Sequence, residues 1–121
     1  LGTSILLITH DMGVIAEVAD RVAVMYAGKI FEEASASSLF KNNLHPYTRG
    51  LLQSIPRIDT RGVKERLNEI PGVVPNLFEA PKGCLFYERC KDRIPKCKIE
   101  PPNLEEVETD HFVRCWRVQN D

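Results

Sequence analysis

The distribution of cysteine constrains the fold of this chain of 121 residues more than any other feature. All of its cysteines follow residue 83; they are Cys84, Cys90, Cys97 and Cys115. Seven of the eight prolines lie between Pro56 and Pro102, where few apolar residues recur with a regular period. Such a loop-rich segment buries too little apolar surface to offset the entropy of ordering it, so we expect the thiols to form a cross-link.

Three explanations of the cysteines are open. In a secreted protein they would form two disulfides, but we expect a reducing cytosol, since the sequence opens without a signal-peptide pattern. Grouped cytosolic thiols more often bind metal, and free thiols in a small core are the third explanation. The spacing Cys-x5-Cys-x6-Cys-x17-Cys lacks the Cys-x2-Cys pairs typical of zinc sites, which disfavours zinc without excluding it.

The residues around the cysteines are compatible with a bound metal group. Between Lys82 and Glu100 there are six basic and three acidic residues. We expect this charge to lower the pKa of the thiols and to stabilise an anionic metal–thiolate group. His111 is a weaker ligand candidate than the thiols. Four aromatic residues near the cysteines are placed to shield such a group from water; they are Phe86, Tyr87, Phe112 and Trp116.

The N-terminal third has the pattern of a β-α-β unit. Residues 4–9 are almost continuously apolar, which is typical of a strand buried on both faces of a parallel sheet. Residues 14–19 place apolar side chains on one helical face, with Asp11 as N-cap. Residues 22–26 predict a second strand, and the 12-residue crossover at 10–21 is about the minimum for a parallel connection.

Further elements follow the second strand. Gly28 and Lys29 predict a tight turn, so residues 22–34 should form a β-hairpin. Ser35 or Ser37 is placed to cap a short helix, and Pro46 to begin another one that ends before Pro56. A doubly buried strand needs neighbours that this sequence does not supply. We therefore expect the chain to be the C-terminal portion of a longer protein and, in isolation, to dimerise through its exposed sheet edges.

Residues 5–30 resemble the switch-histidine region of ABC transporter ATPase subunits, with the motif matched at Thr9, His10 and Asp11. A residue at the C-terminal end of a parallel strand lies at the edge where α/β sheets bind ligands. The resemblance implies that His10 is a catalytic residue that contacts the γ-phosphate of ATP and helps to align the attacking water.

Residues 45–56, 70–75 and 81–90 resemble the C-terminal extension of the dipeptide and oligopeptide branch of these ATPases. The resemblance implies an α/β fold in three parts. Residues 1–34 would be the truncated end of a P-loop-type ABC ATPase core (β-α-β plus hairpin), and 35–56 connecting helices. Residues 57–121 would form a small, loop-rich, cysteine-bearing domain. In some members of the branch the four matching cysteines hold a 4Fe-4S cluster, which four thiolates commonly ligate.

The resemblance also implies a function. The parent protein would be the ATP-binding subunit of a peptide importer, using ATP and Mg²⁺, paired with a second ATP-binding subunit and docked on transmembrane permease subunits. It would be cytoplasmic and peripheral on the inner face of the cell membrane. The chain contains no Gly-x-x-x-x-Gly-Lys-Ser/Thr phosphate loop, ABC signature or Walker B strand, so we expect it to be inactive alone.

A stand-alone zinc-binding interaction or nucleic-acid module, built on residues 84–97, is the alternative. It predicts bound zinc and salt-dependent binding to DNA or RNA. A formal net charge of −1 provides no global basic field for nucleic acid, so we expect no nucleic-acid partner. The longest uninterrupted apolar run, residues 22–27, is far below the roughly 20 residues of a membrane span.

Overall fold

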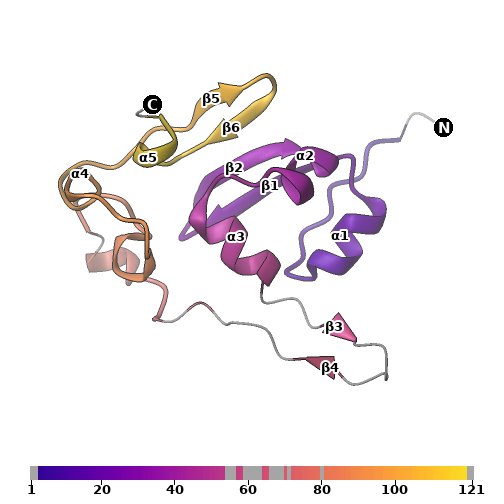
Figure 1. Ribbon diagram of the computed structural model, residues 1–121, viewed down its shortest axis with the longest axis horizontal. Helices are drawn as coiled ribbons and strands as arrows, with labels where there is room; N and C mark the ends of the chain where they lie inside the picture. Colours follow the sequence, from indigo (N-terminus) through magenta and orange to yellow (C-terminus); the bar gives the residue numbers. More distant parts are fainter. Residues whose placement is uncertain are drawn as a thin grey trace.

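A four-stranded antiparallel sheet organises the computed structural model, which describes residues 3–53, 57–58, 64–65, 70, 72–79 and 81–119. Its strands, in spatial order, are β1 (Arg21–Tyr26), β2 (Lys29–Ser35), β6 (His111–Val113) and β5 (Glu105–Glu108). Strands from the two ends of the chain thus lie side by side (Figure 1). The short strands β3 (Arg57–Ile58) and β4 (Lys64–Glu65) form a separate antiparallel pair.

The predicted hairpin is confirmed, and its turn explains its position. Ala27 and Gly28 both have positive φ, 49° and 83°, which two-residue turns between twisted strands require. Strand β1 alternates between exposed and buried residues, with Val22, Val24 and Tyr26 buried on one face. The period of two arises because successive side chains in a strand point to opposite faces.

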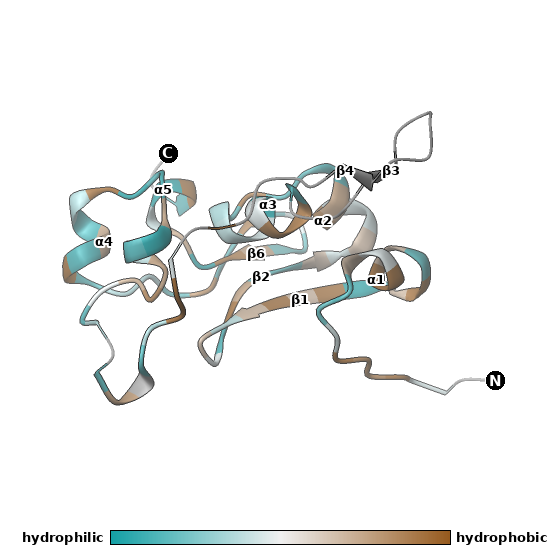
Figure 2. Cartoon of the chain, turned by 90° about the horizontal axis from the view of Figure 1, so that it is seen from below, coloured by the Kyte–Doolittle hydropathy of each residue, from teal (hydrophilic) through white to brown (hydrophobic). Residues whose placement is uncertain are grey.

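Three helices cover this buried face: α1 (Met12–Val18), α2 (Ala36–Lys41) and α3 (Pro46–Gln53) (Figure 2). The caps follow the sequence. Asp11 Oδ1 accepts the backbone N–H groups of Gly13 and Val14, and Ser35 Oγ accepts that of Ser38. Their core contains Met12, Val22, Val24, Ala34 and Leu39. None of the helices in the described ranges has the length and apolar character needed to cross a bilayer.

The prediction of a β-α-β unit is wrong for its first strand. Residues 4–9 form no strand, and the side chains of Ile5, Leu6 and Ile8 are 86–87% exposed. An extended segment becomes a strand only when a neighbour pairs with its backbone, and no described strand does so here. Strand β1 therefore keeps its antiparallel hairpin partner β2 and has no parallel partner among the described strands.

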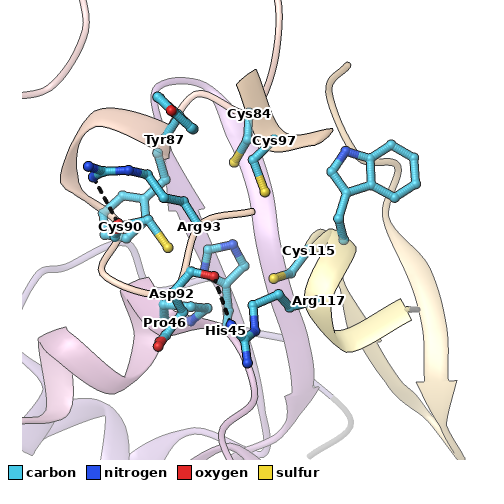
Figure 3. Close-up of a pocket in the computed structure, with 12 residues that line it drawn as sticks. His45, Pro46, Cys84, Tyr87, Cys90, Asp92, Arg93, Cys97, Cys115 and Arg117 are labelled. Atoms are coloured by element: carbon cyan, nitrogen blue, oxygen red, sulfur yellow. Dashed lines mark hydrogen bonds between the residues drawn. The ribbon is translucent and has the colours of Figure 1, made fainter. Parts of the chain in front are cut away.

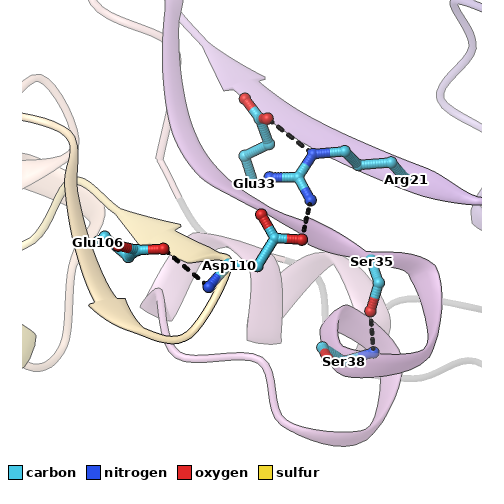
Figure 4. Close-up of polar contacts among 6 residues, drawn as sticks. All are labelled: Arg21, Glu33, Ser35, Ser38, Glu106 and Asp110. Atoms are coloured by element: carbon cyan, nitrogen blue, oxygen red, sulfur yellow. Dashed lines mark hydrogen bonds and ion pairs between the residues drawn. The ribbon is translucent and has the colours of Figure 1, made fainter.

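The C-terminal segment has short elements, as its proline content predicts. They are η1 (Leu77–Glu79), η2 (Tyr87–Arg89), α4 (Pro95–Ile99) and α5 (Trp116–Gln119), the η elements being 3₁₀ turns. Strand β6 joins this segment to β2 through the pairs Glu32–Val113 and Glu33–Phe112. Arg21 adds ion pairs of 2.9 Å to Glu33 and to Asp110, in the turn between β5 and β6 (Figure 4).

Candidate functional site

The four cysteines, which lie up to 31 residues apart in the sequence, line a single pocket (Figure 3). All four are free thiols. Cys84, Cys97 and Cys115 are buried and Cys90 is half-buried. This convergence is what a thiolate-bound metal group requires. Within the described part of the chain, however, no three His, Cys, Asp or Glu side chains form a group that could hold a metal ion as they stand.

A close backbone contact brings the first and third cysteines together. The N–H of Cys84 donates a 2.7 Å hydrogen bond to the carbonyl oxygen of Cys97, in α4. A Cβ added to Gly83 would lie 2.0 Å from the same oxygen, far inside van der Waals contact. Glycine is therefore required at position 83 for the two segments to approach this closely.

The other two cysteines are placed by different elements. Cys90 ends the 3₁₀ turn η2, where its N–H donates to the carbonyl of Tyr87. Cys115 lies between β6 and α5, and the preceding residue, Arg114, donates from its backbone N–H to Phe31 and from Nε to Ile30. The position of Cys115 therefore depends on the pairing of the C-terminal strand with the hairpin.

Burial dominates the electrostatics of the thiols. Desolvation raises the pKa of Cys84 to about 11 and that of Cys90 to about 11, and it also raises the pKa of Cys115. The prediction that local basic charge lowers these pKa values is wrong, because loss of water outweighs it. Without metal the three thiols are protonated at neutral pH, and a bound metal displaces those protons.

The basic residues at the pocket make other contacts. Arg93 donates to the carbonyl of Cys90, and Arg117 donates at 3.4 Å to that of Asp92. The ammonium group of Lys96 lies 3.8 Å from the centroid of the Trp116 ring. These cations hold the loops around the cysteines together, which explains their clustering without a direct contact to sulfur.

Three of the four aromatic residues expected near the cysteines lie at the pocket, and their shielding of a bound group stays a prediction. Phe86, Tyr87 and Trp116 line the pocket, whereas Phe112 lies away from it, with its ring centroid 5.9 Å from the guanidinium carbon of Arg21. The weaker ligand candidate, His111, is also elsewhere: it is buried on β6, where its Nε2 contacts Oε2 of Glu32.

Two residues of the site were missed by the sequence analysis. His45, just before α3, is 2% exposed and lines the pocket with the cysteines. Glu32, on β2, is fully buried and accepts the backbone N–H groups of His45 and Leu44 at 2.9 and 2.8 Å. Two sequence signals were available: a charged residue within a predicted strand, and a histidine before the proline that begins a helix. Neither signal is specific for a functional site.

His10 lies far from the cysteines in sequence and is exposed. Its neighbours shape the turn before α1: Thr9 Oγ1 accepts the N–H of Asp11 at 3.0 Å, and Asp11 in turn caps the helix. Because both flanking side chains bond locally, the imidazole of His10 projects from a defined turn.

Comparison with known families identifies the chain. The family described as "oligopeptide/dipeptide transporter, C-terminal region" matches residues 31–97, more than half of the sequence. The chain belongs to this family. Its matched region includes most of the hairpin strand β2, the helices α2 and α3, and three of the four cysteines.

Relatives of this oligopeptide/dipeptide transporter region extend the match over nearly the whole chain. A probable peptide ABC transporter ATP-binding protein from Sinorhizobium fredii is 50% identical over 97% of the chain. A dipeptide and an oligopeptide transport ATP-binding protein from Bacillus subtilis are each 48% identical, over 93% and 98% of it. The chain spans only about a third of each relative, 35%, 33% and 36% respectively.

Proposed function

We propose that the chain is the C-terminal part of the ATP-binding subunit of a peptide ABC importer, in which ATP binding and hydrolysis drive transport. The observation that carries the proposal is near-50% identity, over almost the whole chain, to proteins named as peptide transport ATP-binding proteins. The complete subunit would bind ATP and Mg²⁺, pair with a second ATP-binding subunit and dock on transmembrane permease subunits. It would lie at the cytoplasmic face of the membrane.

Within that subunit we assign the role of switch histidine to His10. The turn that Thr9 and Asp11 form holds its imidazole at the surface, where it is accessible to a nucleotide bound by other parts of the subunit. A hydrogen bond from the imidazole to the terminal phosphate stabilises the charge that develops during phosphoryl transfer.

The test of this role uses the full-length subunit. We expect His10→Ala to retain ATP binding and to lose hydrolysis by about 10²–10³-fold, the usual effect of removing one transition-state donor. Glu17→Gln, an exposed change on α1, is the matched control and should leave turnover unchanged. Equal hydrolysis by His10→Ala and the wild type would show that the assigned role is wrong.

We further propose that the four cysteines hold one 4Fe-4S cluster. The donor set fits, because four free thiols line one pocket whose wall also includes Phe86, Tyr87 and Trp116. The absence of a Cys-x2-Cys pair disfavours the usual zinc sites. The cluster would supply the cross-link that the loop-rich segment lacks, while Cys84, Cys90, Cys97 and Cys115 supply its thiolates.

Anaerobic purification tests the cluster proposal. The expected result is visible absorbance with iron and acid-labile sulfide, lost in a Cys90→Ser variant. Ser54→Ala, which changes no thiol, is the control and should keep the colour. A colourless wild-type protein with stoichiometric zinc would contradict the proposal and favour the zinc-module alternative.

The predicted dimer of the isolated chain also remains a proposal. The exposed side chains of Ile5, Leu6 and Ile8 support it, because unpaired apolar segments next to open sheet edges favour association. Light scattering on the isolated chain should give twice the chain mass, and a monomer mass would contradict self-association.

A further inference from the structure

One ring nitrogen of His45, Nε2, is buried without a hydrogen-bond partner among the described residues. Its side chain is buried, 2% exposed, and lines the pocket that the four cysteines share. Buried polar atoms in proteins are nearly always hydrogen-bonded, so an exception needs an explanation. His45 Nε2 is such an exception: it has no hydrogen-bond partner among the described residues.

The other ring nitrogen is already used. Nδ1 of His45 accepts the backbone N–H of Tyr47 at 3.0 Å, in the first turn of α3. The backbone N–H of His45 donates to Glu32 Oε1, and the ring stacks on Phe31 with centroids 4.7 Å apart. These contacts fix the orientation of the ring, and an accepting Nδ1 places the proton of the neutral imidazole on Nε2.

Burial disfavours the charged form of an imidazole, so the ring of His45 is neutral. The backbone carbonyl of Arg114 comes near the ring, but no hydrogen bond joins it to Nε2. The result is a buried N–H donor without an acceptor, held beside Cys115 and the other thiols (Figure 3). A donor in this position matches a sulfur that carries negative charge.

We propose that His45 is a positioning residue that donates its Nε2–H to a sulfur of the metal group bound by the four cysteines. The inference rests on the proposed thiolate-bound cluster and assigns a residue that tunes it. A hydrogen bond to sulfur stabilises the more negative, reduced state and so raises the reduction potential.

Two substitutions separate this role from the role of His45 in the turn before α3. Asparagine is a good helix cap whose oxygen can replace Nδ1 as acceptor for Tyr47, but it is too short to place a donor in the pocket. Glutamine is longer, and its amide N–H can approach the position of Nε2. If the donor matters, His45→Asn should change the site and His45→Gln should restore it.

The experiment is a potentiometric titration of the full-length protein, purified anaerobically, with iron content measured on the same samples. With iron retained, we expect His45→Asn to reduce the equilibrium constant for one-electron reduction about tenfold, a lower midpoint potential by about 59 mV. His45→Gln should lie close to the wild type. Lys91→Gln, which removes an exposed cation next to Cys90, is the control for a general charge effect and should leave the midpoint potential close to the wild-type value.

Each outcome decides the inference. Equal potentials in the wild type and His45→Asn, at equal iron content, overturn the role of His45 and leave the cluster proposal intact. Loss of iron in both His45 variants, with unfolding at lower denaturant, also overturns it, because His45 would then act only in folding. A wild-type protein without iron overturns the cluster proposal itself, and the inference with it.

Discussion

The molecule contains two regions that reach an ordered structure by different means. The hairpin and helices α1–α3, which we call the helical region, share a core of periodic apolar side chains such as Val22, Val24 and Leu39. Residues 81–119, which we call the thiol region, contain short elements around a pocket of cysteines. Apolar burial is the main stabilising term of the first region. The second region has a smaller apolar core, in which Phe86 packs with Tyr26 and Phe31 of the hairpin, and it depends in addition on single close contacts and, in our proposal, on a bound cluster.

The largest expected effect comes from Gly83→Ala in the thiol region. Its new Cβ would overlap the backbone of Cys97. A backbone cannot move aside by changing rotamer, so Cys84 and Cys97 must separate. We expect loss of bound iron and a less stable thiol region, measured by iron analysis and thermal unfolding. Gly50→Ala is the matched control, because among the described residues its Cβ would meet the side chain of Ile70, which can change rotamer, rather than a backbone. Full iron content in Gly83→Ala would contradict this explanation.

Glu32→Ala tests the connection between the two regions. Glu32 is fully buried, contacts His111 on β6 and accepts two backbone N–H groups before α3. Breaking a buried pair of this kind costs about 3–5 kcal/mol, so the free energy of unfolding should fall by that amount in urea denaturation. Glu33→Ala, on the same strand with a partly exposed ion pair to Arg21, should cost much less, because solvent screens the pair. Similar losses in both variants would refute the connecting role.

Leu39→Ala tests whether the helical region can be destabilised without affecting the thiol region. Leu39 is fully buried in the core of α2 and the sheet, and truncating such a leucine costs about 2–5 kcal/mol of stability. Iron content per folded chain should stay at the wild-type value, because all four cysteines lie in the thiol region, although His45 and Pro46 line the pocket from the helical region. Val18→Ala, at a mostly exposed position on α1, is the control with little expected change. Loss of iron in Leu39→Ala would mean that the two regions are not separable.

The smallest effect is expected for Ser35→Ala, which removes the N-cap of α2. Losing a cap of this type costs about 1 kcal/mol, which urea denaturation resolves. The sequence left Ser35 and Ser37 as alternative caps, and Ser37→Ala is therefore the natural control, with stability close to the wild type. If Ser37→Ala lost more stability than Ser35→Ala, the assignment of Ser35 as the N-cap would be wrong.

The sequence predicted those features whose causes are local. The caps at Asp11 and Ser35, the hairpin turn at Gly28 and the start of α3 at Pro46 depend on neighbouring residues alone. Sequence patterns could not predict which distant segments pair with one another. Nothing near residue 32 indicates that β2 pairs with β6, a strand 79 residues later that brings His111 onto Glu32. The division at residues 34 and 56 remains a prediction.

The candidate site divides in the same way. The resemblance pointed to the four cysteines as one set, and the structure places them around one pocket. The elevated pKa values of Cys84, Cys90 and Cys115, the requirement for glycine at position 83 and the burial of His45 all depend on packing between segments distant in sequence. No periodicity or motif spacing encodes such contacts, because they arise only once the thiol region lies against the hairpin.

Native mass spectrometry under anaerobic conditions tests the central claim, that four thiols from separate segments bind one common group. The wild-type protein should carry a single mass increment equal to one 4Fe-4S cluster. Serine substitution of any one of Cys84, Cys90, Cys97 or Cys115 should abolish or destabilise it. A wild-type protein at its apo mass, or a variant series in which one cysteine is dispensable, would contradict the account.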